Sequence, residues 1–422
     1  MAVATQSVTD LCRAAKAASR ALAALDSATK DRALLAVADA LEARTDEILE
    51  ANARDLEAGR EAGLSAALMD RLALDASRVA AMARGVREIV ALPDPVGEVI
   101  DGSRIAGGLE MRKVRVPLGV VAVVYEARPN VTIDAAALCL ASGNAILLRG
   151  SSSAAHSNAV LAGVARDAAE AHGLPAGALA LVAGGGRDEL AELAGQEGLV
   201  DLIIPRGGEG LKRALAAVAK VPVIYAASGN CHVYVDASAD LDAAHAIVLN
   251  AKTQRPGVCN AAETLLVHAD VAGAFLPGAL DALHGAGVEL RGDAAARALA
   301  RDGVPVAEAT EEDWAQEFLA LVLAVRVVDS AEEAIEHVNT YGSGHSEAIV
   351  TSSLAAARAF QLGVDAACVY VNASTRFTDG GEFGMGAEIG NSTQKLHARG
   401  PIGLRELCTF KYLVEGTGQV RP

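Results

Sequence analysis

The spacing of apolar positions along this chain changes from helical to strand-like and then alternates. From Val8 to Leu92 apolar residues recur with helical spacing in a segment rich in Ala, Leu, Glu and Arg. Ser and Asp in "LDSATKD" and "LALDASRV" can cap helix starts, so we expect an all-helical N-terminal layer. Two β-like runs around a Gly-Gly turn near 96–117 predict a hairpin.

Beyond Gly119, short apolar runs alternate with Ala-rich helical segments, which is typical of parallel doubly wound sheets. The first set of runs is "GVVAVVYE", "NAILLRG", "ALALVAG", "LVDLIIPRG" and "VPVIYA". The second set is "CHVYVD", "ETLLVHA", "VELRG", "LAVRVVD", "EAIVTS" and "ACVYVNAS". We therefore expect an α/β fold with two doubly wound domains, residues 1–228 with the N-terminal helices and hairpin, and residues 229–398. In the tail, residues 399–422, the run "CTFKYLVEG" suits an edge strand in an oligomer contact.

Composition and charge narrow the class of partner. A chain of 422 residues, 52% hydrophobic and with 41 glycines, is long enough for two buried cores. Its formal charge of -16 repels nucleic acid and anionic membrane surfaces, and no Lys/Arg block offsets this charge locally. We expect a small-molecule partner, with no nucleic acid and no membrane.

The first residues lack the basic start and apolar core of a signal peptide, and no apolar stretch is long enough to span a bilayer, so we expect a cytosolic protein. The six cysteines form no C-x-x-C pair, and we predict neither a metal site nor disulfides. A free cysteine usually packs as a small hydrophobe. Cys259, in "KTQRPGVCNAAET", follows a Pro-Gly turn and precedes an apolar run, so packing and nucleophilic attack both stay open on this pattern alone.

Common catalytic and nucleotide-binding motifs are missing: there is no P-loop, no H-E-x-x-H, no G-x-S-x-G and no complete G-x-G-x-x-G between a strand and a helix. Three strand-to-helix junctions can still bind anions through the free N–H groups of a starting helix. They are "LLRGSSSAAHS", "VAGGGRDE" and "IIPRGGEGLK". Tight turns that need glycine are the alternative explanation for each of them.

Four long segments resemble the aldehyde dehydrogenase superfamily and, within it, the gamma-glutamyl phosphate reductases. They are "YEARPNVTIDAAALCLASGNAILLRG", "KTQRPGVCNAAETLLVH", "AIEHVNTYGSGHSEAIV" and "FGMGAEIGNSTQKLHARGPIGL". The similarity extends over essentially the whole chain. It implies an aldehyde-dehydrogenase-like fold, with an NADP-binding first domain, a catalytic second domain and a C-terminal oligomerisation segment.

The resemblance implies that Cys259 is the nucleophile. A thiolate can attack the acyl phosphate carbon of L-glutamyl 5-phosphate, expel phosphate and leave a thioester, to which NADPH delivers hydride to give L-glutamate 5-semialdehyde. This reaction is the second step of proline biosynthesis from glutamate. The resemblance also implies that the Asn130 side chain and the backbone N–H of Cys259 stabilise the oxyanion. A turn residue after Pro129 is the alternative for Asn130.

For the cofactor, the resemblance places Arg149 near the adenosine ribose. An Arg beside Ser151 could hold a 2′-phosphate, which favours NADPH. Gly207 and Gly208 would open a helix near the pyrophosphate. Glu317 corresponds to the superfamily Glu-x-Phe region near the nicotinamide ribose, although here the Phe directly follows the Glu.

Three arginines are candidates for the substrate phosphate and α-carboxylate: Arg128, Arg255 and Arg376. For His345 we weigh substrate contact against a structural role in its loop. The resemblance further leads us to expect a homo-oligomer and to consider an association with glutamate 5-kinase.

Two other functions compete with a reductase. A hydrolytic aldehyde dehydrogenase needs a carboxylate base, but "IYAASGNCHVYV" (224–235), which corresponds to the family's Glu-Leu-Gly-Gly segment, contains no acid. A non-catalytic nucleotide-binding protein of the same fold would have lost the nucleophile or the oxyanion donor. This chain has both Cys259 and Asn130.

Overall fold

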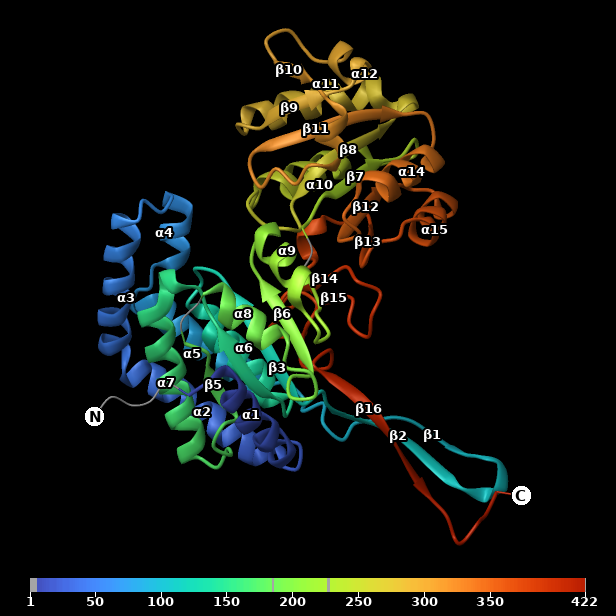
Figure 1. Ribbon diagram of the computed structural model, residues 1–422. Coiled ribbons are helices and arrows are strands. Elements are labelled where there is room, and N and C mark those ends of the chain that lie inside the picture. The colour runs from blue at the N-terminus through green and yellow to red at the C-terminus, as the bar shows by residue number, and fades with distance from the viewer. Residues whose placement is uncertain (1–5, 184–185, 226–227, 422) are drawn as a thin grey trace. The chain divides into compact units, whose positions relative to one another are not determined.

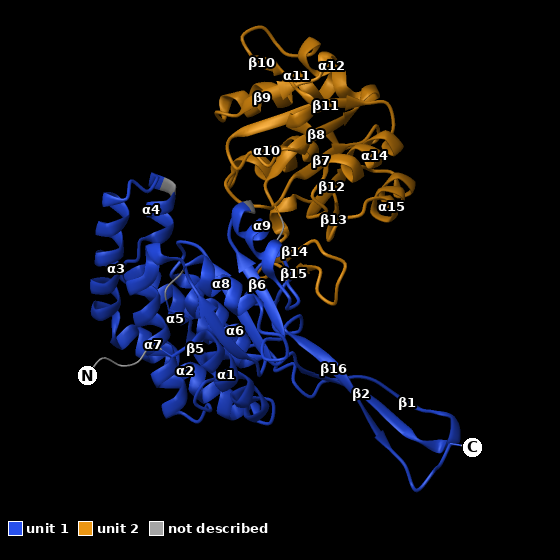
Figure 2. Cartoon of the chain, viewed as in Figure 1, with its two compact units in different colours: residues 1–226, 384–390, 402–422 blue, residues 227–383, 391–401 orange. Residues whose placement is uncertain are grey.

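A computed structural model describes residues 6–183, 186–225 and 228–421. The chain forms two compact units (Figure 2). The first contains residues 1–226, 384–390 and 402–422, and the second contains residues 227–383 and 391–401. Within the described residues no helix is both long and apolar enough to cross a membrane.

The N-terminal layer of the first unit is helical, as the sequence pattern predicts (Figure 1). Its helices are α1 (Val8–Leu22), α2 (Ser27–Ala43), α3 (Thr45–Glu61), α4 (Ala66–Leu72) and α5 (Ala76–Val90). The Asp26 side chain accepts the N–H of Thr29, and the Asp75 side chain accepts the N–H of Arg78. Both predicted caps therefore stabilise helix starts.

A parallel sheet forms the rest of the first unit's core, with strand order β5-β4-β3-β6. Its strands are β3 (Val120–Tyr125), β4 (Ala145–Arg149), β5 (Leu179–Leu181) and β6 (Leu202–Arg206). The helices between and after them are α6 (Asn130–Ala141), α7 (Ala155–Ala171), α8 (Arg187–Ala194) and α9 (Glu209–Val218), with a 3-10 turn η2 (Ser152–Ala154). The strand order reverses between β3 and β6, and the carboxyl ends at such a switch point are where ligands bind.

One strand predicted for this unit forms only in part. Of "VPVIYA", Val223 makes a single parallel bridge to Ile203, and the last residue lies outside the described residues. Residues 184–185 of the junction "VAGGGRDE", the first of which also ends the predicted run "ALALVAG", lie outside them as well.

The predicted hairpin is present as β1 (Val99–Arg104) and β2 (Glu110–Pro117), joined through the 3-10 turn η1 (Ala106–Gly108). Gly107 and Gly108 have φ of 84° and 82°, which the Gly-Gly sequence makes accessible. The tail strand β16 (Cys408–Glu415) pairs antiparallel with β2 along its whole length. These three strands form an arm that extends away from the rest of the first unit (Figure 1).

The second unit contains a seven-stranded parallel sheet of order β10-β9-β11-β8-β7-β12-β13. Its strands are β7 (Cys231–Val235), β8 (Ala262–His268), β9 (Glu289–Gly292), β10 (Val306–Glu308), β11 (Val322–Val328), β12 (Ser346–Val350) and β13 (Cys368–Val371). Residues from α10 (Leu241–Thr253) and α11 (Ala269–Gly285) pack in one apolar cluster, and residues from α14 (Ala331–Tyr341) and α15 (Leu354–Gly363) pack in another. The remaining elements are α12 (Ala294–Ala298), α13 (Glu311–Ala315), η3 (Thr375–Phe377), β14 (Asn391–Ser392) and β15 (Gly400–Pro401). The expectation of two doubly wound domains with a small β element is confirmed.

The units divide the chain differently from the sequence-based ranges near its end. The first boundary, at residue 226, lies close to the expected 228, but residues 384–390 belong to the first unit rather than to the second. Residues 402–422 also belong to the first unit, because β16 is paired with β2. The N–H of Ile389 donates to the carbonyl of Ile402 at 2.9 Å, which joins the two returning segments.

Candidate active site

Cys259 lies in the loop between α10 and β8, at the amino end of the second unit's sheet. Its side chain is half-buried, whereas Cys12, Cys139, Cys231 and Cys408 are buried. Burial raises the pKa of Cys12 to about 11 and the pKa of Cys408 to about 12. Those thiols stay protonated and enclosed, so Cys259 is better placed than they are to meet a substrate.

Hydrogen bonds hold the backbone on the carboxyl side of Cys259. The Cys231 thiol donates to the Cys259 carbonyl at 3.2 Å, and the Thr375 hydroxyl donates to the Asn260 carbonyl at 2.7 Å. The Asn260 side chain in turn donates to the Thr378 carbonyl at 2.9 Å. The loop that carries Cys259 is therefore tied to β7 and to the segment around η3.

Glu317 lies beside the same loop. Its carboxylate accepts the N–H of Gly229 at 2.6 Å. A Cβ on Gly229 would fall on the carbonyl oxygen of Cys259, so only glycine fits there. Sequence reasoning did not single out Gly229, because no local pattern reports a close approach between segments far apart in the chain.

Two guanidinium groups lie near the Cys259 loop. Arg376 donates from Nε to the Gln254 side chain at 2.7 Å. Burial lowers the pKa of Arg376, and the positive charge of Arg255 lowers it further. A bound anion would relieve this repulsion. Arg376 also lines an open hollow with Asn250, Gln254, Phe377, Asp379 and Glu382.

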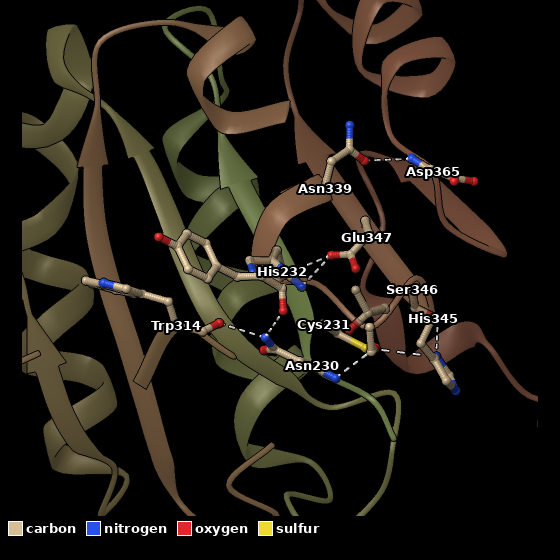
Figure 3. A network of polar contacts seen from close by, with 12 residues as sticks. Asn230, Cys231, His232, Trp314, Asn339, His345, Ser346, Glu347 and Asp365 are labelled. Atoms are coloured by element: carbon tan, nitrogen blue, oxygen red, sulfur yellow. Dashed lines mark hydrogen bonds and ion pairs between the residues drawn. The ribbon is translucent and has the colours of Figure 1, made fainter. Parts of the chain in front are cut away.

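His345 is buried directly before β12 (Figure 3). Its Nδ1 lies 2.8 Å from the Ser346 hydroxyl and 3.9 Å from the Cys231 sulfur. Burial lowers the pKa of His345 to about 4, so the imidazole is neutral at neutral pH. These contacts support its structural role in the loop, and substrate contact stays a prediction.

Asn130 begins α6 directly after β3 and its loop, at the carboxyl edge of the first unit's sheet. Its exposed side chain donates from Nδ2 to the Asp134 carboxylate at 2.9 Å. Burial raises the pKa of Asp134 to about 6, against the effects of the Asn130 hydrogen bond and the charge of Arg206. Asp134 was missed from the sequence, although its spacing of four residues from Asn130 places both on one helix face.

Gly207 and Gly208, which are predicted to lie near the pyrophosphate, directly precede α9. The N–H of Gly208 donates a hydrogen bond to the Glu126 carboxylate at 3.0 Å. An anionic group is therefore already bound at the amino end of α9. A Cβ on Gly207 would lie 2.7 Å from Cδ2 of Leu211 and 2.8 Å from the Glu126 carboxyl. The lack of a side chain at Gly207 keeps this approach to the helix open.

Arg149 ends β4 and is buried. It donates from Nη2 to the Gly186 carbonyl at 2.6 Å, while its buried Nε has no hydrogen-bond partner in the described part of the chain. Ser151 accepts the N–H of Ala127 at 3.1 Å and lies 2.6 Å from the Ser153 hydroxyl. An unsatisfied guanidinium donor at this edge fits a phosphate or ribose ligand.

The structure places the predicted residues in two groups, one in each unit. The carboxyl edge of the first unit's sheet carries Arg128, Asn130, Arg149, Ser151, Gly207 and Gly208. The second unit carries Arg255, Cys259, Glu317 and His345. The predicted joint action of Asn130 and Cys259 concerns residues of different units and stays a prediction.

Comparisons with known proteins identify the family of this chain. The family model described as "Aldehyde dehydrogenase family" matches residues 2–295 and 306–411. Gamma-glutamyl phosphate reductases from Thermobifida fusca (strain YX) and Syntrophomonas wolfei are 58% and 56% identical, each over 96% of this chain and at least 96% of the relative. The crystal structure of gamma-glutamyl phosphate reductase from Thermotoga maritima has 45% sequence identity and a TM-score of 0.96, over 99% of this chain and 100% of that chain. This chain therefore belongs to the aldehyde dehydrogenase family and, within it, to the gamma-glutamyl phosphate reductases.

Proposed function

We propose that this chain uses NADPH to reduce L-glutamyl 5-phosphate to L-glutamate 5-semialdehyde and phosphate through a thioester on Cys259. This reaction is the second step of proline biosynthesis from glutamate. The observation that carries the proposal is the half-buried Cys259 on a braced loop, in a chain 58% identical to a gamma-glutamyl phosphate reductase over nearly its full length.

The first step is attack of the Cys259 thiolate on the acyl carbon. The new C–S bond forms while the carbonyl π electrons move to oxygen, and collapse of this oxyanion breaks the C–O bond to phosphate. Asn130 supplies a donor for the oxyanion from its side-chain amide, which has two N–H groups, one of them bound by Asp134. The backbone N–H of Cys259 supplies the second donor.

A reduced nicotinamide, when bound, would supply a hydride for the thioester carbon. Asn130 and the Cys259 N–H stabilise the second oxyanion by the same donors, and its collapse returns the electron pair to the Cys259 sulfur and releases the aldehyde. We assign Glu317, whose carboxylate accepts the N–H of Gly229, to the region of the nicotinamide ribose, as the resemblance implies. Gly207 and Gly208 would hold the pyrophosphate at the start of α9.

Arg149 carries the proposed preference for NADPH, because its buried Nε, at the end of β4, has no hydrogen-bond partner among the described residues. We expect Arg149→Ala to weaken NADPH binding by roughly 10- to 100-fold, the range for a charge-assisted hydrogen bond, and NADH binding by less than about threefold. Titration of each cofactor by fluorescence measures both constants. An equal loss for the two cofactors would show that another residue selects NADPH.

Substrate anions would bind near the arginines. The positive charges of Arg255 and Arg376 repel each other beside the Cys259 loop. A phosphate or carboxylate bound between them would relieve this repulsion. Arg128, at the carboxyl edge of the first unit's sheet, and His345 are the other candidates for substrate contact.

The proposal has three further parts. The chain forms a homo-oligomer through the β1-β2-β16 arm, it associates with glutamate 5-kinase, and it is located in the cytoplasm. The arm supports the first of these, because large apolar side chains are exposed along it. The other two rest on the resemblance to the gamma-glutamyl phosphate reductases.

The phosphate requirement of the reverse reaction tests the reductase against a hydrolytic dehydrogenase. Residues 224–235 contain no acid, and the carboxylates of Glu263, Glu317 and Glu347 accept the N–H groups of Leu319, Gly229 and His232. A thioester on Cys259 should therefore wait for phosphate as the nucleophile.

NADPH formation from glutamate semialdehyde and NADP should continue over many turnovers with phosphate or arsenate and stop after a single-turnover burst without them. Sustained turnover in a buffer free of both anions would overturn the proposal and favour hydrolysis. Direct reduction of glutamyl 5-phosphate supplies the forward measurement.

A further inference from the structure

Cys231 is a second cysteine beside the proposed nucleophile, and the reaction above does not use it. It begins β7 and is fully buried. Its thiol donates to the carbonyl oxygen of Cys259 at 3.2 Å. A buried thiol aimed at the backbone of another cysteine calls for an explanation beyond packing, because its bond fixes the orientation of that peptide.

A chain of polar contacts continues from Cys231 to His345 and to Ser346, the first residue of β12 (Figure 3). The Cys231 sulfur lies 3.9 Å from Nδ1 of His345, and this nitrogen lies 2.8 Å from the Ser346 hydroxyl. The Ser346 hydroxyl lies 2.6 Å from the hydroxyl of Thr378. These side chains are buried, so water does not compete for their hydrogen bonds.

The same chain returns to the residue after Cys259. The Thr378 carbonyl accepts the Asn260 side chain at 2.9 Å, and the Thr375 hydroxyl donates to the Asn260 carbonyl at 2.7 Å. The contacts thus leave the backbone at Cys259 and come back at Asn260. Both carbonyls on the carboxyl side of the nucleophile are fixed by side chains from other segments of the unit.

The protonation states suit this arrangement. Burial raises the pKa of Cys231 well above its ordinary value, and the nearby charges of Glu347, Cys259 and Glu263 raise it further. Burial lowers the pKa of His345 to about 4. At neutral pH Cys231 is therefore a neutral S–H donor and His345 a neutral imidazole, so neither adds a charge that competes with Cys259 for the substrate.

Gly229 restricts the Cys259 carbonyl from a second direction. A Cβ at this position would fall on that oxygen, and the N–H of Gly229 is bound by the Glu317 carboxylate. The carbonyl is therefore confined between the backbone leading into β7 and the thiol that begins this strand.

We propose that Cys231 is a positioning residue for the nucleophile: its thiol fixes the Cys259 carbonyl, and His345, Ser346, Thr378 and Asn260 complete the bracing of the loop. The inference rests on the proposed function, in which Cys259 attacks the substrate. A fixed peptide at Cys259 holds the sulfur in the attack geometry, and errors of about 1 Å in such geometry can reduce turnover by roughly 100-fold.

The test compares Cys231→Ala, which removes the donor, with Cys231→Ser, which keeps an O–H donor, in the full chain. We expect Cys231→Ala to lower kcat by roughly 10-fold with KM for glutamyl 5-phosphate changed by less than about twofold, since one hydrogen bond to the loop is lost. Cys231→Ser should return kcat to within about threefold of the unchanged chain. Cys139→Ala, which removes a buried thiol from α6, is the matched control and should keep kcat while lowering thermal stability.

A second readout does not depend on substrate or cofactor. The rate of iodoacetamide alkylation at the Cys259 peptide, followed by mass spectrometry, should change in Cys231→Ala and return toward its original value in Cys231→Ser. If Cys231→Ala does not fold, Thr375→Val, which removes the hydroxyl bound to the Asn260 carbonyl, should show the same loss of kcat.

Two outcomes separate this inference from the function on which it rests. Equal kcat and equal alkylation in Cys231→Ala and the unchanged chain would reduce Cys231 to a packing residue. Retained turnover in Cys259→Ser would instead overturn the proposed function. Loss of turnover in Cys259→Ser together with full activity in Cys231→Ala would contradict only the positioning role of Cys231 and would leave the proposed function in place.

Discussion

Among the six cysteines, surroundings rather than residue type distinguish Cys259 from the buried thiols. Four of the other cysteines, Cys12, Cys139, Cys231 and Cys408, are buried. Burial raises the pKa of each of these thiols. The prediction that Cys259 is the nucleophile rests on the resemblance of its segment to the aldehyde dehydrogenase superfamily. The sequence could not predict Cys231 as its neighbour, because that contact joins the first residue of β7 to the loop that follows α10.

Replacement of Cys259 by Ala should abolish turnover, by at least about 1000-fold, because the proposed thioester cannot form without the Cys259 thiol. Thermal unfolding and cofactor titration should show a folded chain that still binds NADPH. The control Cys139→Ala should keep turnover and cost roughly 1 kcal/mol of stability, since it removes a buried sulfur. Turnover above about a tenth of the original rate in Cys259→Ala would contradict the covalent mechanism.

Asp134 gives the first unit a pH dependence of stability. Its pKa is raised to about 6 by burial in the folded chain, above its ordinary value. Folding therefore favours the protonated form of Asp134. This contribution to the stability of the fold is present at low pH and is lost as the pH rises through about 6. The hydrogen bond from Asn130 and the positive charge of Arg206 lower the pKa of Asp134 and so oppose the effect of burial.

Asp134→Asn removes this ionisation and keeps a polar partner for Asn130. We expect the melting temperature of Asp134→Asn, relative to the unchanged chain, to rise between pH 4.5 and 7 and then to level off. Thermal unfolding at four pH values measures this difference. A difference independent of pH would mean that Asp134 does not titrate in this range.

At the scale of elements, the alternation of apolar runs and Ala-rich helices predicted most strands of both sheets. The central strands are long apolar runs buried on both faces, such as β3 and β8, and their pattern is unambiguous. The exceptions are short edges: β10 has only three residues, mostly exposed, and Val223 forms a single bridge. Short edge segments gain little from burial, so their apolar pattern carries little information.

The positions of the sites relative to the strands follow from different rules in the two units. In the first unit, Asn130, Arg149 and Gly207 lie at or just after the carboxyl ends of parallel strands, where nucleotide ligands bind. In the second unit, Cys259 precedes β8 at the amino edge of the sheet. The sequence pattern predicted that Cys259 precedes a strand. The general rule that ligands bind at the carboxyl ends of parallel strands gives no reason to expect an active site at the amino end.

The adjacent glycines at the start of α9 give a matched pair. Gly207→Ala should destabilise the chain by about 1–3 kcal/mol, because the new Cβ would lie 2.7 Å from Leu211 and 2.8 Å from Glu126. Gly208→Ala has nothing within 4 Å of its new Cβ and should change stability by less than about 0.5 kcal/mol. Chemical denaturation of both variants decides the point, and equal losses would mean that helix propensity or the backbone, not the contact, sets the cost.

At the scale of the whole chain, the sequence predicted two domains but not which pieces return to the first. Residues 384–390 and 402–422 both join the first unit, separated by residues 391–401 of the second. These segments are short, and what assigns them is pairing with distant partners, such as β16 with β2. Long-range pairing of this kind leaves no periodic signal in the segment itself.

The arm formed by β1, β2 and β16 leads to a prediction about assembly. Phe410, Tyr412 and Val414 alternate along β16 and are 45%, 54% and 51% exposed, so their side chains form an apolar row on one face of the strand. β16 is also an edge strand, with backbone donors and acceptors on one side not paired within the sheet order β1-β2-β16. An apolar row on an open edge favours contact with a second copy of the chain.

We therefore expect the unchanged chain to be a homo-oligomer and Tyr412→Asp to dissociate it, as measured by light scattering after size-exclusion chromatography. Placing an unpaired charge in an apolar contact costs at least about 2 kcal/mol, which raises the dissociation constant by roughly 30-fold. Leu362→Asp is the control, because Leu362 is 89% exposed on α15, away from the arm in sequence and in the second unit, and should leave the mass unchanged. Dissociation in both variants would show a general effect of added charge, and an unchanged mass in Tyr412→Asp would place the contact between copies elsewhere than on this face of β16.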